Sequence, residues 1–365
     1  MEMHKLLTAT RDLIAGDGGF TRRIHWPRRS WLAVFTASLA VCAFALVAAA
    51  RTHGEKSKSQ PGHEPPPYWA FTGNPAAKAA RHRAPRPDNH KLLHVPGSTK
   101  AFTQQQIDAA AFNPPDWHPD GHPPMPEIVA HGRKPIVMAC GFCHLPNGQG
   151  RPENSSLAGL PAGYIIQQMA DFKSGRRKPS KMTVPIEAMT THETQANAAE
   201  IKAAAHYFSS IKPKPWIHVI ETRTVPKTHA DAWMLVRTAG GGRVPIGHRI
   251  IETPVNQRLT ELRDDASGFI AYVPVGSVEK GKALATTGGY GKTMNCEMCH
   301  GPGLRGQGDV PTIAGRSPSY IVRQLYDFRS GSRNGPDAQM MKPVTAKLTL
   351  DDMVSLAAYL ASLHP

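Results

Sequence analysis

The sequence lacks the signatures of a nucleic-acid-binding protein. It has no arginine-rich helix with interleaved aromatic residues, no zinc-finger spacing and no RNA-binding motif. Acidic residues are also few, 28 against 43 lysines and arginines, which leaves a net charge of +15. This charge permits an anionic membrane surface or an acidic protein as a partner, whereas nucleic acid is not expected.

Cysteine is scarce as well. The chain has 5 cysteines in 365 residues, and four of them lie in two copies of one pattern, CGFCH at 140–144 and CEMCH at 296–300. Two structural disulfides would not require a histidine after each pair. No βαβ alternation flanks the motifs, which argues against a thioredoxin-like centre, and a zinc site would have to join two pairs 156 residues apart. Covalent haem attachment remains, because CxxCH is its sequence signal.

An internal repeat makes this interpretation specific. Residues 159–177 align with 315–333 at the same offset of 156 that separates the two CxxCH motifs, and nine of the 19 aligned positions are identical. The chain therefore contains a duplicated domain with one CxxCH motif in each copy. Each copy is expected to close with an apolar helix, over residues 203–211 and 355–363.

A methionine is expected opposite each histidine, because a thioether as the sixth ligand gives an electron-transfer haem of raised potential. Met182 and Met341 are the candidates. Each lies seven residues before an apolar residue, Met189 or Leu348, that precedes the final helical region.

Alternatives to this ligand set stay open. Met340 competes with Met341, and bis-histidine ligation in the first copy would use His192 or His206. Three further methionines are assigned to ordinary core packing: Met169, Met189 and Met353.

These features resemble bacterial class I cytochromes c, in particular the dihaem type with two domains in tandem, the cytochrome c-four type. The resemblance rests on both CxxCH motifs and on residues 157–177, 313–333 and 341–363. It implies two covalently attached haem c groups. The residues that it assigns to them are Cys140, Cys143, His144 and Met182 in the first copy, and Cys296, Cys299, His300 and Met341 in the second. It also implies a backbone carbonyl that orients each histidine, at Ser155 and Pro311.

The N-terminal region predicts export. Residues 31–50 carry no charge over 20 positions, long enough for a membrane helix, and four arginines precede them. The positive-inside rule then leaves residues 1–30 in the cytoplasm. A retained anchor in the inner membrane is expected, with the bulk of the chain in the periplasm. A signal cleaved after the alanines at 48–50 is the alternative, which would leave a soluble periplasmic protein.

The predicted fold is mainly α, with two tandem class I cytochrome c domains, a small β-rich insertion between them and an N-terminal transmembrane helix. The insertion is predicted because residues 213–278 contain strand-like alternating and apolar runs. His118 and His122 lie in a loop and are expected to face solvent, so no metal site is predicted there. The predicted segments are a tail (1–30), an anchor or signal (31–50), a proline-rich tether (51–97), the first haem domain (98–212), the insertion (213–278) and the second haem domain (279–365).

The expected function is periplasmic electron transfer by two six-coordinate haems, which makes the chain a carrier rather than an enzyme. Its partners would be a membrane donor and an acidic-surfaced acceptor or oxidase, steered by a basic run: Lys173, Arg176, Arg177, Lys178 and Lys181. Two alternatives stay open: a haem subunit of a membrane dehydrogenase complex, and a dihaem peroxidase-like enzyme with one open iron. A haem-based sensor is disfavoured, because a 30-residue tail offers no output domain.

Overall fold

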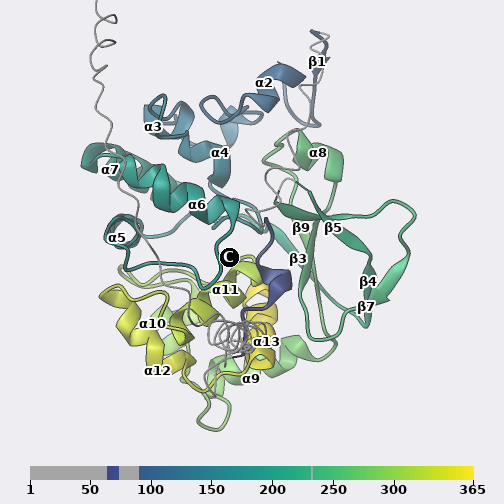
Figure 1. Ribbon diagram of the computed structural model, residues 1–365, viewed down its shortest axis with the longest axis vertical. Helices are drawn as coiled ribbons and strands as arrows, with labels where there is room; N and C mark the ends of the chain where they lie inside the picture. Colours follow the sequence, from purple (N-terminus) through teal and green to yellow (C-terminus); the bar gives the residue numbers. More distant parts are fainter. Residues whose placement is uncertain (1–63, 74–89, 232) are drawn as a thin grey trace, which may run out of the picture. The chain divides into compact units, whose positions relative to one another are not determined.

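The computed structural model describes residues 64–73, 90–231 and 233–365, and Figure 1 colours them along the chain. The predicted tail (1–30) and the predicted membrane or signal segment (31–50) lie outside the described residues. The same holds for residues 51–63 and 74–89 of the predicted tether.

The first haem domain is helical. Its elements are α3 (Glu127–Ala130), α4 (Cys140–His144), α5 (Ala162–Lys173), α6 (Val184–Thr191), η5 (Glu193–Gln195) and α7 (Ala198–Ser210). Helix α7 begins with a capping box, because the Asn197 side chain accepts from the Glu200 amide and the Glu200 carboxylate accepts from the Asn197 amide. Its buried face, with Ala205 and Phe208, packs into a core shared with α3 and α5.

The second haem domain repeats this pattern. Its elements are α9 (Ser277–Thr287), α10 (Glu297–His300), η6 (Pro302–Leu304), α11 (Pro318–Arg329), η7 (Asp337–Met340), α12 (Met341–Thr345) and α13 (Leu350–Ser362). A capping box of Thr349 and Asp352 starts α13. Helices α9 and α13 lie side by side (Figure 1). Gly281 permits the close approach, because a Cβ there would collide with the Ser355 carbonyl oxygen.

A group of short strands separates the two haem domains in sequence. They are β3 (Ile217–Glu221), β4 (Thr224–Pro226), β5 (Thr228–Asp231), β6 (Met234–Arg237), β7 (Arg243–Pro245), β8 (Ile251–Pro254) and β9 (Phe269–Val273), with α8 (Gln257–Glu261) before β9. Strand β9 is central in a three-stranded sheet, parallel to β3 and antiparallel to β8. Strands β4 and β7 form one antiparallel pair and β5 and β6 another.

The chain before α3 packs against later parts of the molecule. Its elements are η1 (Tyr68–Ala70), β1 (Leu92–Leu93), β2 (Phe102–Thr103), α2 (Gln104–Asp108) and η4 (Pro119–Gly121). Trp69 and Phe71 are buried in the core of the second haem domain, and the Ala70 carbonyl accepts from Arg323 at 2.7 Å. Trp117 is buried with Leu262 of the insertion and donates to the Leu262 carbonyl at 2.8 Å.

The predicted fold class therefore needs correction. A mainly α chain is wrong, because the described residues contain four small sheets beside the helices. The predicted transmembrane helix is not supported either: no helix within 64–73, 90–231 and 233–365 is long and apolar enough to cross a membrane. The physical reason is length: the longest of these helices, α7 and α13, have 13 residues each, whereas a membrane-spanning helix needs about 20.

Candidate haem sites

The first attachment motif lies on one short helix. Helix α4 contains Cys140, Cys143 and His144, so the two sulfurs come from one helical turn. The cysteines of the described residues are free thiols, which excludes the disulfide interpretation of the CxxCH motifs there. Burial raises the pKa of Cys140 above its ordinary value and that of Cys143 to about 12. Both are neutral thiols in an apolar environment, available for thioether bonds.

The histidine of each motif is held by a backbone carbonyl. His144 Nδ1 lies 2.8 Å from the Ser155 carbonyl oxygen, and His300 Nδ1 lies 2.8 Å from that of Pro311. The predicted carbonyl contacts are thus confirmed at both positions. Burial lowers the pKa of both histidines, which are neutral. Because a carbonyl only accepts, Nδ1 carries the proton and Nε2 keeps the lone pair that a metal needs.

The first motif opens into an apolar cavity of about 1230 Å³, including the space at its mouth. Cys140, Cys143 and His144 line it together with apolar side chains such as Ile165 and Phe208. Residues of α11 in the second haem domain line it as well: Tyr320, Arg323 and Gln324. Two thiols, one imidazole and an apolar enclosure fit a covalently bound haem.

The two copies differ in where they place their methionines. Met182 is 44% exposed and does not line the cavity, whereas Met189 does. Met189 precedes the first residue of α7 by nine positions, 198 − 189, and Met341 precedes that of α13 by nine, 350 − 341. Counted from the closing helix, Met189 is therefore the structural counterpart of Met341. The cavity is not lined by His192 or His206.

The second motif also lies on a short helix. Cys296 is the N-cap of α10, and burial raises its pKa to about 11. Cys299 and His300 follow on the helix. Met341 is partly buried and packs against the core of the second haem domain, whereas the competing Met340 is 68% exposed.

The insertion braces the first motif, which the sequence did not indicate. Leu145, directly after His144, is buried in a cluster with Trp216 and Phe269 of the insertion. Arg263 lies over the ring of Phe142, 4.6 Å from its centroid, and donates to the Phe142 carbonyl. The attachment turn is thus held from outside its own domain.

A symmetric network joins the two haem domains. It contains three pairs of residues that correspond in the repeat: Tyr164 and Tyr320, Gln168 and Gln324, Arg177 and Arg333. Arg177 donates to Tyr320 at 3.1 Å, and Arg333 donates to Tyr164 at 3.4 Å. Each arginine also donates to both glutamines. Burial alone would raise the pKa of Tyr164, but the two positive charges outweigh it and lower that pKa.

Four residues of the predicted basic run are exposed: Lys173, Arg176, Lys178 and Lys181. The Lys173 ammonium also donates to the Ala196 carbonyl at 2.5 Å. Arg177 is half-buried and belongs to the interdomain network, so it does not contribute to the exposed basic surface.

Comparison with known proteins identifies the class. Residues 278–364 match the family model for cytochrome c. The chain is 37% identical over 84 residues to cytochrome c-554(547) of Halothiobacillus neapolitanus, covering 20% of this chain and 92% of that protein. The chain belongs to the cytochrome c family.

Two longer matches cover 62% of the chain. The chain is 26% identical over 233 residues to the "thiosulfate dehydrogenase electron acceptor" of Thiomonas intermedia (strain K12), covering 62% of this chain and 80% of that protein. It is 25% identical over 237 residues to cytochrome c4 of Azotobacter vinelandii, covering 62% and 86%. Covalently bound haem c groups, one for each CxxCH motif, are the cofactors, and electron transfer is the function.

Proposed function

We propose that the chain is a periplasmic electron carrier in which each haem iron is held by one histidine and one methionine, His144 with Met189 and His300 with Met341. The observation that carries this proposal is the first cavity, where His144 and Met189 line one apolar space. Met189 and Met341 each lie nine residues before the closing helix of their domain, α7 or α13, which supports the same assignment in both copies. Met189 replaces the sequence-based candidate Met182.

A haem held by these residues would supply a reversible one-electron couple at its iron. The chain's residues hold and tune that couple. The carbonyls of Ser155 and Pro311 fix the imidazoles with Nε2 free. Apolar side chains exclude water, and a thioether favours the reduced state. The first cavity reaches α11 of the second domain, which supports transfer between the two sites within one chain.

A periplasmic dehydrogenase is the proposed electron donor. The relative in Thiomonas intermedia is named as a thiosulfate dehydrogenase electron acceptor, and its match covers 62% of this chain. The exposed Lys178 and Lys181 follow the interface arginine and offer a cationic contact for an acidic-surfaced partner. Periplasmic location is supported by the uncharged run at 31–50 after its arginines. Cell fractionation tests it: recovery of the haem protein with cytoplasmic markers would contradict it.

Spectroscopy of the purified holoprotein tests the carrier function and the ligands together. Optical and low-temperature spin-resonance spectra should show two low-spin haems, and the reduced protein should not bind carbon monoxide. Met189→Ala should open one iron to carbon monoxide, whereas its control Met182→Ala should not. In the second domain, Met341→Ala should likewise open one iron to carbon monoxide, whereas its control Met340→Ala should not.

Each outcome separates the hypotheses. Carbon monoxide binding by the unmodified protein would favour the peroxidase-like enzyme. An iron opened by Met182→Ala but not by Met189→Ala would restore the sequence-based ligand and reject the assignment from the cavity. If neither Met189→Ala nor Met182→Ala binds carbon monoxide, the result would point to bis-histidine ligation in the first domain.

A further inference from the structure

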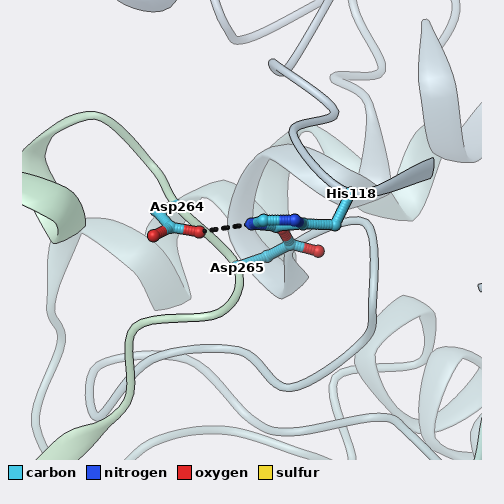
Figure 2. A group of neighbouring side chains, drawn as sticks. All are labelled: His118, Asp264 and Asp265. Carbon is cyan, nitrogen blue, oxygen red and sulfur yellow. Dashed lines mark hydrogen bonds and ion pairs between the residues drawn. The ribbon is translucent and has the colours of Figure 1, made fainter. Parts of the chain in front are cut away.

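A second cluster of metal-binding side chains lies outside the haem sites. His118 precedes η4, and Asp264 and Asp265 lie on the turn between α8 and β9. One ligand atom from each residue lies within 4.8 Å of the other two. His118 Nε2 is 2.9 Å from Asp264 Oδ1. Figure 2 shows the carboxylates of both aspartates beside the imidazole of His118.

The two carboxylates are buried with little to compensate them. Asp264 and Asp265 are each 4% exposed. Asp264 Oδ1 also accepts from the Ala266 amide at 2.9 Å, but Asp265 Oδ1 has no hydrogen-bond partner. In the described part of the chain, no lysine or arginine forms an ion pair with either aspartate. Adjacent buried carboxylates repel each other, and a buried oxygen without a hydrogen-bond partner destabilises the fold.

The second histidine beside the cluster is not free to bind an ion. His122 Nε2 lies 3.1 Å from Asp116, and its Nδ1 lies 3.0 Å from the Tyr207 hydroxyl. Both ring nitrogens are therefore in use. Asp116 brings a third carboxylate to the same region. The cluster has an excess of oxygen ligands and one imidazole.

Both sides of the cluster are held by buried contacts. Trp117, next to His118, is 1% exposed and donates to the Leu262 carbonyl at 2.8 Å. On the other side, the Asn147 amide donates to the Asp265 carbonyl. The donors are thus preorganised on two segments 146 residues apart in sequence. Two ligand atoms of one tetrahedral Zn²⁺ lie about 3.3 Å apart, so His118 Nε2 and Asp264 Oδ1 would move slightly apart, and small shifts of the side chains would bring all three ligand atoms to the ion.

We propose that His118, Asp264 and Asp265 bind one divalent transition-metal cation, with zinc as the representative ion. One imidazole nitrogen and two carboxylate oxygens suit Zn²⁺, whereas Ca²⁺ prefers ligands that are all oxygen. The unpaired Asp265 oxygen is the observation that points to a ligand. The ion neutralises the buried carboxylates and ties the 116–122 loop to the turn after α8.

This tie acts close to the first haem motif. Arg263 directly precedes Asp264 and contacts the ring and carbonyl of Phe142, within the CxxCH sequence. An ion at the cluster therefore fixes the segment that braces the attachment turn. Its role is structural, and it takes no part in electron transfer.

Metal counting on the full-length holoprotein tests the site. After dialysis against Zn²⁺ and then against a weak chelator, the protein should retain one zinc for every two haem irons by mass spectrometry of the elements. Asp265→Asn keeps the size of the side chain and should weaken Zn²⁺ binding at least tenfold, as should His118→Gln. The haem spectrum of each variant checks that it has folded. Equilibrium dialysis with Ca²⁺ should show no binding at this site.

The control is an exposed histidine–aspartate pair. His248 Nδ1 lies 3.0 Å from Asp351 Oδ1, but both side chains are largely exposed. His248→Gln should leave the zinc count unchanged. Retention of the same zinc in Asp265→Asn and His118→Gln would overturn the proposal, as would a folded wild-type protein that retains no zinc. In either case the cluster is a histidine–aspartate ion pair only.

Discussion

Arg177 and Arg333 meet across the interface of the two haem domains as an isolated antiparallel backbone bridge. They occupy equivalent positions in the repeat, and each side chain reaches the tyrosine of the opposite copy. Arg177 lines the first cavity, and Arg333 donates to Gln168, a neutral residue that lines the cavity too. This relationship bears on both the stability of the interface and the potential of the first haem.

Replacing Arg333 should loosen the interface. Arg333→Gln removes donors from Tyr164 and Gln168, and the lost hydrogen bonds to a charged group predict a decrease of about 2 kcal/mol in the free energy of unfolding. Urea unfolding followed by circular dichroism measures it. Arg305→Gln is the control, because Arg305 is exposed and its replacement should change stability by less than about 0.5 kcal/mol. Equal effects of the two changes would contradict a role for the network.

Replacing Arg177 should lower the potential of the first haem. A positive charge lining the cavity disfavours oxidation, so Arg177→Gln should shift that midpoint potential downward by tens of millivolts. A spectroscopic redox titration measures both haems. Arg176→Gln is the matched control: its side chain is 54% exposed, and screening by solvent should leave both potentials almost unchanged. No shift in Arg177→Gln would place its charge too far from the haem.

The aromatic segment before the haem domains should stabilise the second of them. Trp69→Ala is expected to cost about 3 kcal/mol, because Trp69 is buried in that domain's core. Tyr68→Ala next to it should cost little, since Tyr68 is 68% exposed. Urea unfolding midpoints of the two variants give the comparison, and similar midpoints would mean that the segment does not dock in solution.

Asp352 should make the second domain sensitive to acid. Burial alone would raise its pKa, but bonds from Lys292, Thr349 and Lys280 hold that pKa well below its ordinary value. A carboxyl group with a depressed pKa stabilises the fold above its unfolded pKa of about 4, and this contribution is lost as pH falls further. Asp352→Asn should therefore cost about 2 kcal/mol at pH 7 and progressively less below pH 4.

The neighbouring residue provides the control for this pH dependence. Asp351 is exposed and is also in the first turn of α13, so Asp351→Asn should retain the wild-type response to acid. Thermal unfolding at pH 7 and pH 3 distinguishes the two variants. A constant difference between Asp352→Asn and the wild type at both pH values would contradict the assigned role.

The haem motifs and the duplicated helices were predictable because each is local in sequence. A CxxCH turn and a capping box involve residues three or four positions apart. The caps give a second way to count to the sixth ligand: Asn197 and Thr349 start the closing helices, and Met189 and Met341 each lie eight residues before them. Counting from the apolar residues Met189 and Leu348 selects Met182 instead, and the two counts differ because α6 and η5 occupy the first copy where α12 occupies the second.

Other contacts had no local signal. Trp69 reaches a core formed more than 200 residues later, and its proline-rich surroundings resemble a tether. His118 meets Asp264 across 146 residues, and Arg263 meets Phe142 across 121. No pairing of this kind follows from spacing or composition, because it depends on how the insertion packs against the first haem domain.

The exchange of equivalent bonds between Tyr164, Arg177, Tyr320 and Arg333 has an evolutionary consequence. Bonds that are reciprocal in this way are the mark of an interface between identical subunits related by a two-fold axis. A single-haem ancestor that paired with itself through this surface would need no new contacts after gene duplication and fusion. The tandem chain then corresponds to a homodimer whose two subunits have been fused into one polypeptide. After fusion, the rest of each haem domain could change in sequence while the residues of the interface were kept.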